Sequence, residues 1–308
     1  MTVRDTIGQI ATGYTGTIYF SSSDVQAGLP ASYTFTAADA GVHTFSETFK
    51  TAGMQSISVR DAMGTLNGSQ LGISVSSAAF AGYRLSVPNP TDGKGHVFVT
   101  AGDAVSLTVR ATDAFGNLVV GYKGKARFSS TDVQAGLPAD YSFTAADAGV
   151  HTFTVVLKST TPNSVVWSLN VVDTANAATL STITNFEVTN AAASKFVLAV
   201  PSNITAGTPF SLKVSITDAY GNGVKNYFGT IHFSNTAGIA GLPADYTFSS
   251  ADAGVHSFTL TLNAAGNQTL SVADVADGLL KATSAVSVKA ATATGGGGGA
   301  SGGGGKKV

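Results

Sequence analysis

The chain contains one stretch of about 25 residues in three copies. The octet ADAGVHTF occupies residues 38 to 45 and 146 to 153, and ADAGVHSF occupies residues 251 to 258. The full copies are SSSDVQAGLPASYTFTAADAGVHTF, SSTDVQAGLPADYSFTAADAGVHTF and SNTAGIAGLPADYTFSSADAGVHSF. An interval of roughly 105 residues is that of whole domains in tandem, since solenoid repeats recur every ~20 to 50 residues. The repetition therefore predicts an array of similar domains.

The pattern inside each repeat is that of β-strands. Apolar residues alternate with polar ones at Phe210, Leu212 and Val214 and again at Val105 and Leu107, which is the period of a strand with one buried face. The segments 113–117 (DAFGN) and 218–222 (DAYGN) carry the Asp, Gly and Asn that turns require. A further strand is expected to begin at Val42 and at its equivalents. About seven strands per ~100 residues predict an all-β chain of tandem Ig-like Greek-key β-sandwiches.

The copies set the expected boundaries. Repeat 1 spans residues 1–79, repeat 2 spans 80–190, repeat 3 spans 194–290, and a Gly-rich flexible tail follows at 291–308. Met1 aligns with Val109 and Val214, so repeat 1 is N-terminally incomplete and lacks the first two strands, that is, the first and most of the second. Such a gap exposes core and an unpaired edge. Either the chain is a fragment of a longer repetitive protein, or strands of another molecule fill the gap.

Composition excludes several classes of partner. Only 11% of the residues are charged and the formal net charge is -1, so the chain offers no basic field for nucleic acid or anionic lipid. It contains no stretch of apolar residues long enough for membrane insertion. With no cysteine, it holds neither a disulfide framework nor a thiolate site. We expect no nucleic-acid partner and no membrane insertion.

The repeated octet raises the question of chemistry. An aspartate and a histidine recur together, and these residues are Asp39, His43, Asp147, His151, Asp252 and His256. Strand alternation places each histidine on the apolar face, beside Phe45 and its equivalents. This pattern favours a structural corner, in which the aspartate closes the turn into the strand. The alternative is an Asp–His pair that serves a nucleophile, but the chain has no G-x-S-x-G elbow. We expect the protein not to be an enzyme.

Two other segments are candidate ligand sites. Repeat 2 alone carries the insertion PTDGKGHVF at 90–98, a possible ligand loop for a carbohydrate or a protein, and its candidate residues are Thr91, Asp92, Lys94 and His96. Asp132 and Asp140 flank the AGLP loop of repeat 2 and could hold calcium through hard oxygen ligands. The first copy has Ser32 and the third has Ala237 at the matching positions. We therefore expect no cofactor, with calcium as a minor alternative.

The order of these motifs resembles that of a known family. A D-x-x-G-N turn, an aromatic strand, ADAGV, an alternating strand and AG-x-Q before an aspartate resemble the bacterial Ig-like repeats of large surface proteins. The resemblance is to the invasin and intimin type and, more distantly, to filamin repeats, and it covers residues 1 to about 290. It implies a location at the bacterial cell surface or outside the cell. It also implies spacer or adhesive modules, whose partners are neighbouring repeats, copies of the chain, or a host or cell-surface glycan or protein.

Three functional hypotheses follow from this sequence. The first is a structural and adhesive stalk segment of a bacterial extracellular repetitive protein, favoured by short links between repeats at 77–82 and 190–194. The second is a subunit of a self-assembling extracellular filament, joined by strand complementation at the incomplete repeat 1. The third is an Ig-like module that binds a carbohydrate or a protein through the inserted loop.

Overall fold

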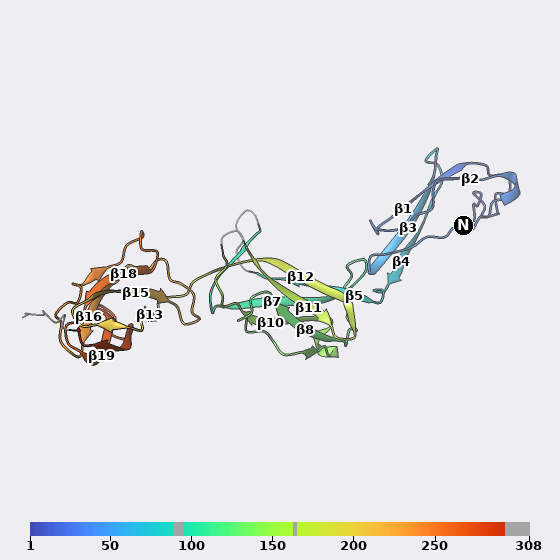
Figure 1. Ribbon diagram of the computed structural model, residues 1–308. Helices are drawn as coiled ribbons and strands as arrows, with labels where there is room; N and C mark the ends of the chain where they lie inside the picture. Colours follow the sequence, from blue (N-terminus) through green and yellow to red (C-terminus); the bar gives the residue numbers. More distant parts are fainter. Residues whose placement is uncertain (89–94, 163–164, 293–308) are drawn as a thin grey trace, which may run out of the picture. The chain divides into compact units, whose positions relative to one another are not determined.

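The computed structural model describes residues 1–88, 95–162 and 165–292 of the chain. These residues form β-strands joined by turns and two single-turn 3-10 helices, and the all-β class is confirmed (Figure 1). No helix within the described ranges is long and apolar enough to cross a membrane. The contacts divide the chain into two compact units. The first unit comprises residues 1–97, 104–156 and 166–186, and the second comprises 98–103, 157–165 and 187–308.

Repeat 2 is a sandwich of two sheets. Its strands are β5 (Phe80–Ser86), β6 (Val97–Thr100), β7 (Ala104–Asp113), β8 (Lys125–Ser130), β9 (Tyr141–Ser142), β10 (Val150–Val156), β11 (Trp167–Asp173) and β12 (Asn176–Thr189). One sheet has the order β10-β7-β5 and the other the order β6-β12-β11-β8-β9. Strands far apart in the chain are thus neighbours in a sheet, as the sandwich prediction requires.

Repeat 3 has the same architecture. Its strands are β13 (Lys195–Ala199), β14 (Ile204–Thr205), β15 (Pro209–Thr217), β16 (Thr230–Asn235), β17 (Tyr246–Thr247), β18 (Val255–Thr261), β19 (Gly266–Asp274) and β20 (Lys281–Lys289). The sheets are β13-β15-β18 and β14-β20-β19-β16-β17. Strand β14 runs parallel to β20, whereas the other pairings of these sheets are antiparallel.

Strand alternation fills the cores of these sandwiches. Val105, Leu107 and Val109 of β7 are fully buried, and Leu212 and Val214 of β15 take the equivalent positions. Polar residues between them point to the other face of the sheet. The apolar period read from the sequence therefore corresponds to the buried face of the central strand in each three-stranded sheet.

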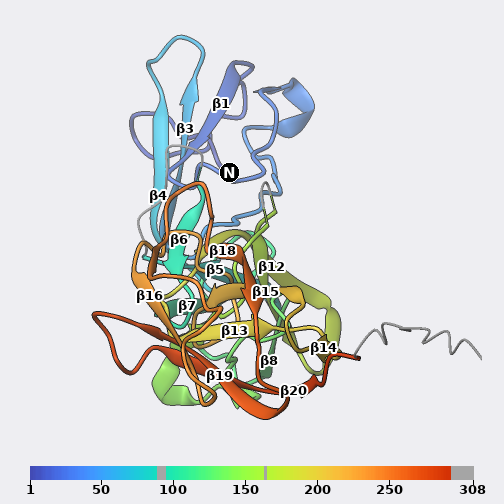
Figure 2. The same ribbon diagram turned by 60° about the vertical axis from the view of Figure 1, so that its left-hand side comes forward.

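Repeat 1 has a single four-stranded sheet within the described residues. Its strands are β1 (Thr17–Ser22), β2 (Tyr33–Thr34), β3 (Gly53–Asp61) and β4 (Asn67–Val75), in the order β2-β1-β3-β4. In the turned view β1, β3 and β4 lie side by side (Figure 2). The counterpart of the β10-β7-β5 sheet is reduced to isolated bridges, such as the one between Thr2 and Val42.

The prediction of a strand beginning at Val42 is wrong for repeat 1. Residues 43–47 have no regular secondary structure, although β10 and β18 form at the same place in the other repeats. The reason is the lack of a partner: β10 pairs with β7 along its whole length, whereas no described segment forms a ladder with residues 43–47. An extended segment without a neighbour cannot complete a hydrogen-bonded ladder.

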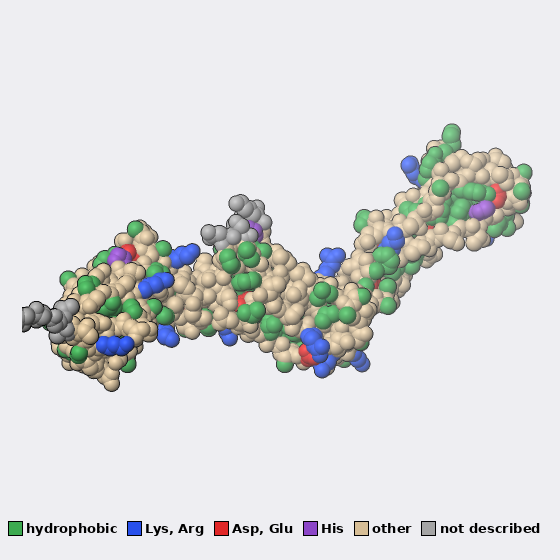
Figure 3. All heavy atoms as spheres, in the orientation of Figure 1, with side chains coloured by type: hydrophobic (Ala, Val, Ile, Leu, Met, Phe, Trp, Pro, Cys, Tyr) green, Lys and Arg blue, Asp and Glu red, His purple; other side chains and the backbone are tan. Residues whose placement is uncertain are grey.

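The molecular surface carries few charges. On the face shown in Figure 3, Lys, Arg, Asp and Glu side chains are scattered among uncharged groups, as expected from 11% charged residues.

Candidate functional site

The repeated octet forms a tight corner between two strands. In repeat 1, Ala37–Asp39 is a 3-10 turn, followed by Ala40 with φ 47° and Gly41 with φ 78°. A Cβ on Gly41 would lie 2.6 Å from the carbonyl oxygen of Ala11. Glycine is needed there because the backbone is left-handed and another backbone segment passes closely.

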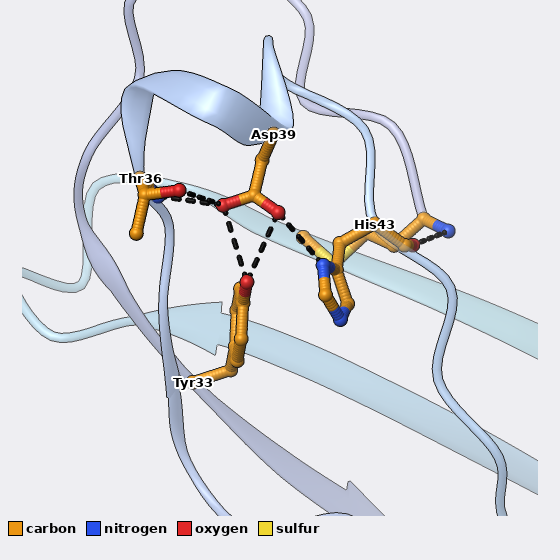
Figure 4. A network of polar contacts seen from close by, with 5 residues as sticks. Tyr33, Thr36, Asp39 and His43 are labelled. Atoms are coloured by element: carbon orange, nitrogen blue, oxygen red, sulfur yellow. Dashed lines mark hydrogen bonds and ion pairs between the residues drawn. The ribbon is translucent and has the colours of Figure 1, made fainter.

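The aspartate of the corner is the centre of a polar network (Figure 4). Asp39 Oδ2 accepts hydrogen bonds from the backbone N–H of Thr36 at 2.6 Å and from its hydroxyl at 2.8 Å. Asp39 Oδ1 lies 3.0 Å from the donating hydroxyl of Tyr33 and 2.8 Å from Nδ1 of His43. The His43 ring also lies against the Tyr33 ring, with centroids 4.1 Å apart. One carboxylate thereby fixes a turn, a strand and an aromatic pair.

The same network recurs in the other two repeats. Asp147 accepts from Thr144 and Tyr141 and contacts His151 Nδ1 at 2.6 Å. In repeat 3, Ser249 replaces the threonine, and the distance from Asp252 to His256 Nδ1 is again 2.6 Å. The structure therefore brings together all six Asp and His residues, in three separate pairs, one in each repeat.

Hydrogen bonding favours the ionised carboxylate at each corner. The backbone N–H of Thr36, the imidazole of His43 and the Thr36 hydroxyl hold the pKa of Asp39 well below its ordinary value. The backbone N–H groups of Thr144 and Ser249 act in the same way on the pKa of Asp147 and of Asp252. Burial and the bond to the aspartate raise the pKa of the partner tyrosine, as for Tyr33. The charged aspartate is the acceptor on which the corner depends.

The side chains of each corner are engaged with one another. The aspartate side chains are only 8 to 10% exposed and their oxygens are occupied by donors of the same corner. Across residues 1–88, 95–162 and 165–292, no group of three or more His, Cys, Asp and Glu side chains is placed to hold a metal ion. The structural interpretation of the six residues stays a prediction, and the network is its physical basis.

The inserted loop of repeat 2 lies mainly outside the described residues. Thr91, Asp92 and Lys94 belong to the segment that the structure does not describe, while His96 lies beside it, just before β6. The structure therefore leaves this candidate ligand loop untested, and it stays a prediction.

The two aspartates considered for calcium have other surroundings. Asp140 Oδ2 lies 2.8 Å from Arg127 and 3.7 Å from Lys125, and these cations lower the pKa of Asp140. Asp132 is buried and accepts a hydrogen bond from the backbone N–H of Gln134. Two positive charges beside Asp140 oppose cation binding there.

A buried tyrosine–aspartate pair in each sandwich was missed by the sequence interpretation. In repeat 3 the Tyr227 hydroxyl donates to Asp274, and in repeat 2 the Tyr122 hydroxyl donates to Asp173 and contacts the Tyr83 hydroxyl at 2.5 Å. Burial raises the pKa of Tyr83 to about 12. The signal that could have found the pair is an aspartate that follows the tyrosine of each Y-x-G after 47 to 51 residues, at Asp61, Asp173 and Asp274.

Repeat 1 has an open cavity where the other repeats have a core. Its volume is about 630 Å³, and its lining includes Tyr14, Ile18, Phe20 and Val59. In repeat 2 the residue equivalent to Val59 is Val171, which is fully buried. The Tyr14 hydroxyl is buried and has no hydrogen-bond partner, unlike its equivalents in repeats 2 and 3. The cavity therefore lies over core positions of the repeat that no other described segment covers.

No protein-family model matches the sequence, and a search of curated proteins finds no match.

Solved structures with a similar arrangement include adhesins and an enzyme. FdeC, described as a broadly conserved Escherichia coli adhesin, is 20% identical at a TM-score of 0.34, over 77% of this chain and 74% of that one. Invasin, described as a bacterial integrin-binding protein, is 18% identical at 0.32, over 94% of this chain and about half (55%) of that one. The apo β-glucuronidase 3 of Bacteroides uniformis is 13% identical at 0.26, over 67% of this chain and 25% of that one.

Proposed function

We propose that the chain is a structural and adhesive stalk segment of a bacterial extracellular repetitive protein. The observation that carries the proposal is the way in which the links between repeats are held. The backbone N–H of Ala78 donates to Asp113 Oδ2 at 2.9 Å, and that of Ala191 donates to Asp218 Oδ2 at 3.0 Å. Two links of different sequence are thus each tied to the equivalent aspartate of the repeat that follows.

These aspartates are suited to the task. Asp113 and Asp218 are 4% and 2% exposed, so the bonds they accept are shielded from water. Burial alone would raise the pKa of Asp113, but donors such as the Asn117 side chain and the Ala78 N–H hold it below its ordinary value. A chain that fixes its links through buried ionic hydrogen bonds is built to transmit position and force.

The recurring polar residues also support a mechanical role. The Asp–His corners and the Tyr–Asp pairs are used inside each repeat, where they hold strands together. The uncharged, hydroxyl-rich exterior is compatible with weak contacts to a host or cell-surface glycan or protein. The extracellular bacterial setting rests on the motif resemblance of the sequence.

The solution mass tests this proposal against assembly. We expect light scattering coupled to size-exclusion chromatography to give the monomer mass of 30.9 kDa across a concentration series. A ladder of multiples that grows with concentration would contradict a segment that acts as a single stalk.

The open cavity of repeat 1 favours a second candidate function, a subunit of an extracellular filament joined by strand complementation. In repeats 2 and 3 the equivalent space is covered by β7 and β15, whose Val105, Leu107 and Leu212 are fully buried. A strand of this type from another copy would cover Phe45 and pair with the irregular segment 43–47. It would supply the ladder that this segment lacks.

A peptide tests this second candidate. We expect a peptide with the sequence of residues 101–108 (AGDAVSLT) to slow amide hydrogen exchange of segment 43–47, because the segment gains a strand partner. The matched control peptide carries Leu107→Asp and should have no effect. Equal exchange with and without the first peptide would overturn strand addition at this face.

A further inference from the structure

The D-x-x-G-N turn of repeat 2 makes a two-point contact with repeat 1. Asn117 Oδ1 accepts a hydrogen bond from the backbone N–H of Ala52 at 2.9 Å. Asn117 Nδ2 donates to the carbonyl oxygen of Lys50 at 2.6 Å and to Asp113 Oδ2 at 2.8 Å. Both donor hydrogens and the amide oxygen are therefore engaged, and two of the three bonds reach the preceding repeat.

Repeat 3 makes the same contact with the segment at 157–162. Asn222 Oδ1 accepts from the backbone N–H of Thr160 at 2.9 Å, and Nδ2 donates to the carbonyl oxygen of Lys158 at 2.7 Å. The third bond, to Asp218 Oδ2, is 2.8 Å long. The three distances agree within 0.1 Å with those at Asn117. Side chains 105 positions apart thus hold different sequences in one geometry.

Hydrogen bonds within each repeat fix the turn and the corner that form the contact. Asp113 Oδ1 accepts from the backbone N–H groups of Phe115 and Asn117, which closes the turn. On the other side, the buried Asp24 accepts from the backbone N–H groups of Lys50 and Thr51 at 2.6 and 2.9 Å. Preorganised partners lose little conformational entropy when they meet.

The turn of repeat 1 and the corner of repeat 3 are both exposed. Repeat 1 has the same turn, in which Asp5 Oδ1 accepts from the backbone N–H of Gln9, and the Gln9 side chain is exposed. Repeat 3 has the corner that corresponds to Lys50–Ala52 at Asn263–Ala265, and all three of its residues are exposed. Where a turn faces a corner, as at Asn117 and Ala52, both are at least partly buried.

We propose that the asparagine of the D-x-x-G-N turn is the docking residue that fixes each repeat on the corner of the preceding one. The corner at Asn263–Ala265 is then a surface that fits one kind of partner, a further repeat carrying the same turn. This inference rests on the proposed stalk function and deepens it, because it assigns the stiffness of each joint to one side chain.

The chemistry requires an amide. An aspartate of the same shape has no hydrogen to donate, so Asn117→Asp loses the bonds to Lys50 and to Asp113. It also places a carboxylate against the Lys50 carbonyl oxygen and the Asp113 carboxylate, and both contacts are repulsive. The turn itself keeps the two bonds from Phe115 and residue 117 to Asp113 Oδ1.

Distance measurements between spin labels test the joint in the full chain. The chain has no cysteine, so labels can be placed by pairs of substitutions at exposed positions. Met63→Cys with Val133→Cys spans the joint at Asn117, and Phe98→Cys with Ile239→Cys spans the joint at Asn222. We expect a narrow distance distribution for each pair in the otherwise unchanged chain. Asn117→Asp should abolish the narrow peak between positions 63 and 133 and leave that between 98 and 239 unchanged.

Matched variants keep the result interpretable. Asn222→Asp should give the reverse pattern, and Gln9→Glu, which adds a carboxylate to the turn of repeat 1, should change neither distribution. Amide exchange within β8, β11 and β12 checks that repeat 2 stays folded. If Asn117→Asp unfolds repeat 2, the Asn222→Asp chain, read across the second joint, decides.

Two results would overturn the inference. One is a broad distribution across both joints before any substitution at the asparagines. The other is a narrow distribution that survives both Asn117→Asp and Asn222→Asp. Neither result bears on the stalk proposal, which fails separately if light scattering shows a ladder of multiples.

Discussion

Replacing the buried tyrosine by phenylalanine should have different effects on the stability of repeat 3 and of repeat 1. Tyr227→Phe removes a hydroxyl that donates a hydrogen bond to Asp274, and Asp274 is only 7% exposed. Hydrogen bonds to charged groups contribute about 1.5 to 3 kcal/mol, and a buried acceptor left without its donor costs a similar amount. The carboxylate of Asp274 keeps the backbone donors Ala276 and Asp277, so the loss should stay within that range. We expect Tyr227→Phe to destabilise repeat 3 by about 2 kcal/mol.

The equivalent change in repeat 1 should have no such cost. The Tyr14 hydroxyl is buried without a partner, so Tyr14→Phe removes an unsatisfied polar group. The expected effect lies between neutral and about 1 kcal/mol of stabilisation of repeat 1. The two substitutions delete the same atom at the same place in the repeat, and they differ only in the partner.

Amide hydrogen exchange followed by mass spectrometry resolves the repeats in the intact chain. Since about 1.4 kcal/mol is tenfold in an equilibrium constant, Tyr227→Phe should accelerate exchange in β16 and β19 roughly 10- to 150-fold. Tyr14→Phe should leave exchange in β1 and β3 unchanged or slower. Equal acceleration by both substitutions would refute the argument, because the partner would then not matter.

The remaining predictions concern the corners and the joints. Gly149→Ala should destabilise repeat 2 by roughly 1 to 3 kcal/mol in urea unfolding, because φ of residue 149 is 78° and the new Cβ would lie 2.5 Å from the carbonyl oxygen of Val119. Ala148→Gly should be neutral or stabilising in the same assay, because φ of residue 148 is 47° and glycine adopts this value without strain. Because the folded-state pKa values of Asp39, Asp147 and Asp252 are depressed, their stabilisation is present above the unfolded pKa of about 3.9 and is lost as pH falls below it. The urea concentration at the unfolding midpoint, measured from pH 7 to pH 2, should therefore decrease once the pH drops below about 4. Asp252→Asn should make this decrease smaller for repeat 3. Repeating residues 191–290 after position 290 should protect the Ala265 amide from exchange, and unchanged exchange there would argue against a docking corner.

The architecture could be predicted because its signals are local or repeated. Alternation at Phe210, Leu212 and Val214 predicts a strand with one buried face, and β15 is that strand. The ADAGV turn needs a glycine for its own backbone, so the octet indicates a corner before any partner is known. Repetition added the domain size and register.

The prediction failed where the decisive partner is absent or distant. The segment after Val42 has the pattern of a strand, yet no strand forms there because no described segment pairs with it. The aspartate that accepts from Tyr227 lies 47 positions further along the chain, beyond any local pattern. Asn117 was interpreted only as a turn residue, because turn propensity concerns the backbone and says nothing of where the amide reaches.

Single-molecule extension of the intact chain tests most directly whether these repeats are mechanical modules. Repeats 2 and 3 should each unfold in one step that stretches about 100 residues to a length of roughly 350 Å, since each residue spans ~3.5 Å when extended. Repeat 1, whose cavity is open, should yield first and at the lowest force. Gradual extension without two such steps would contradict the account, because the corners and buried pairs would then not close independent structural units.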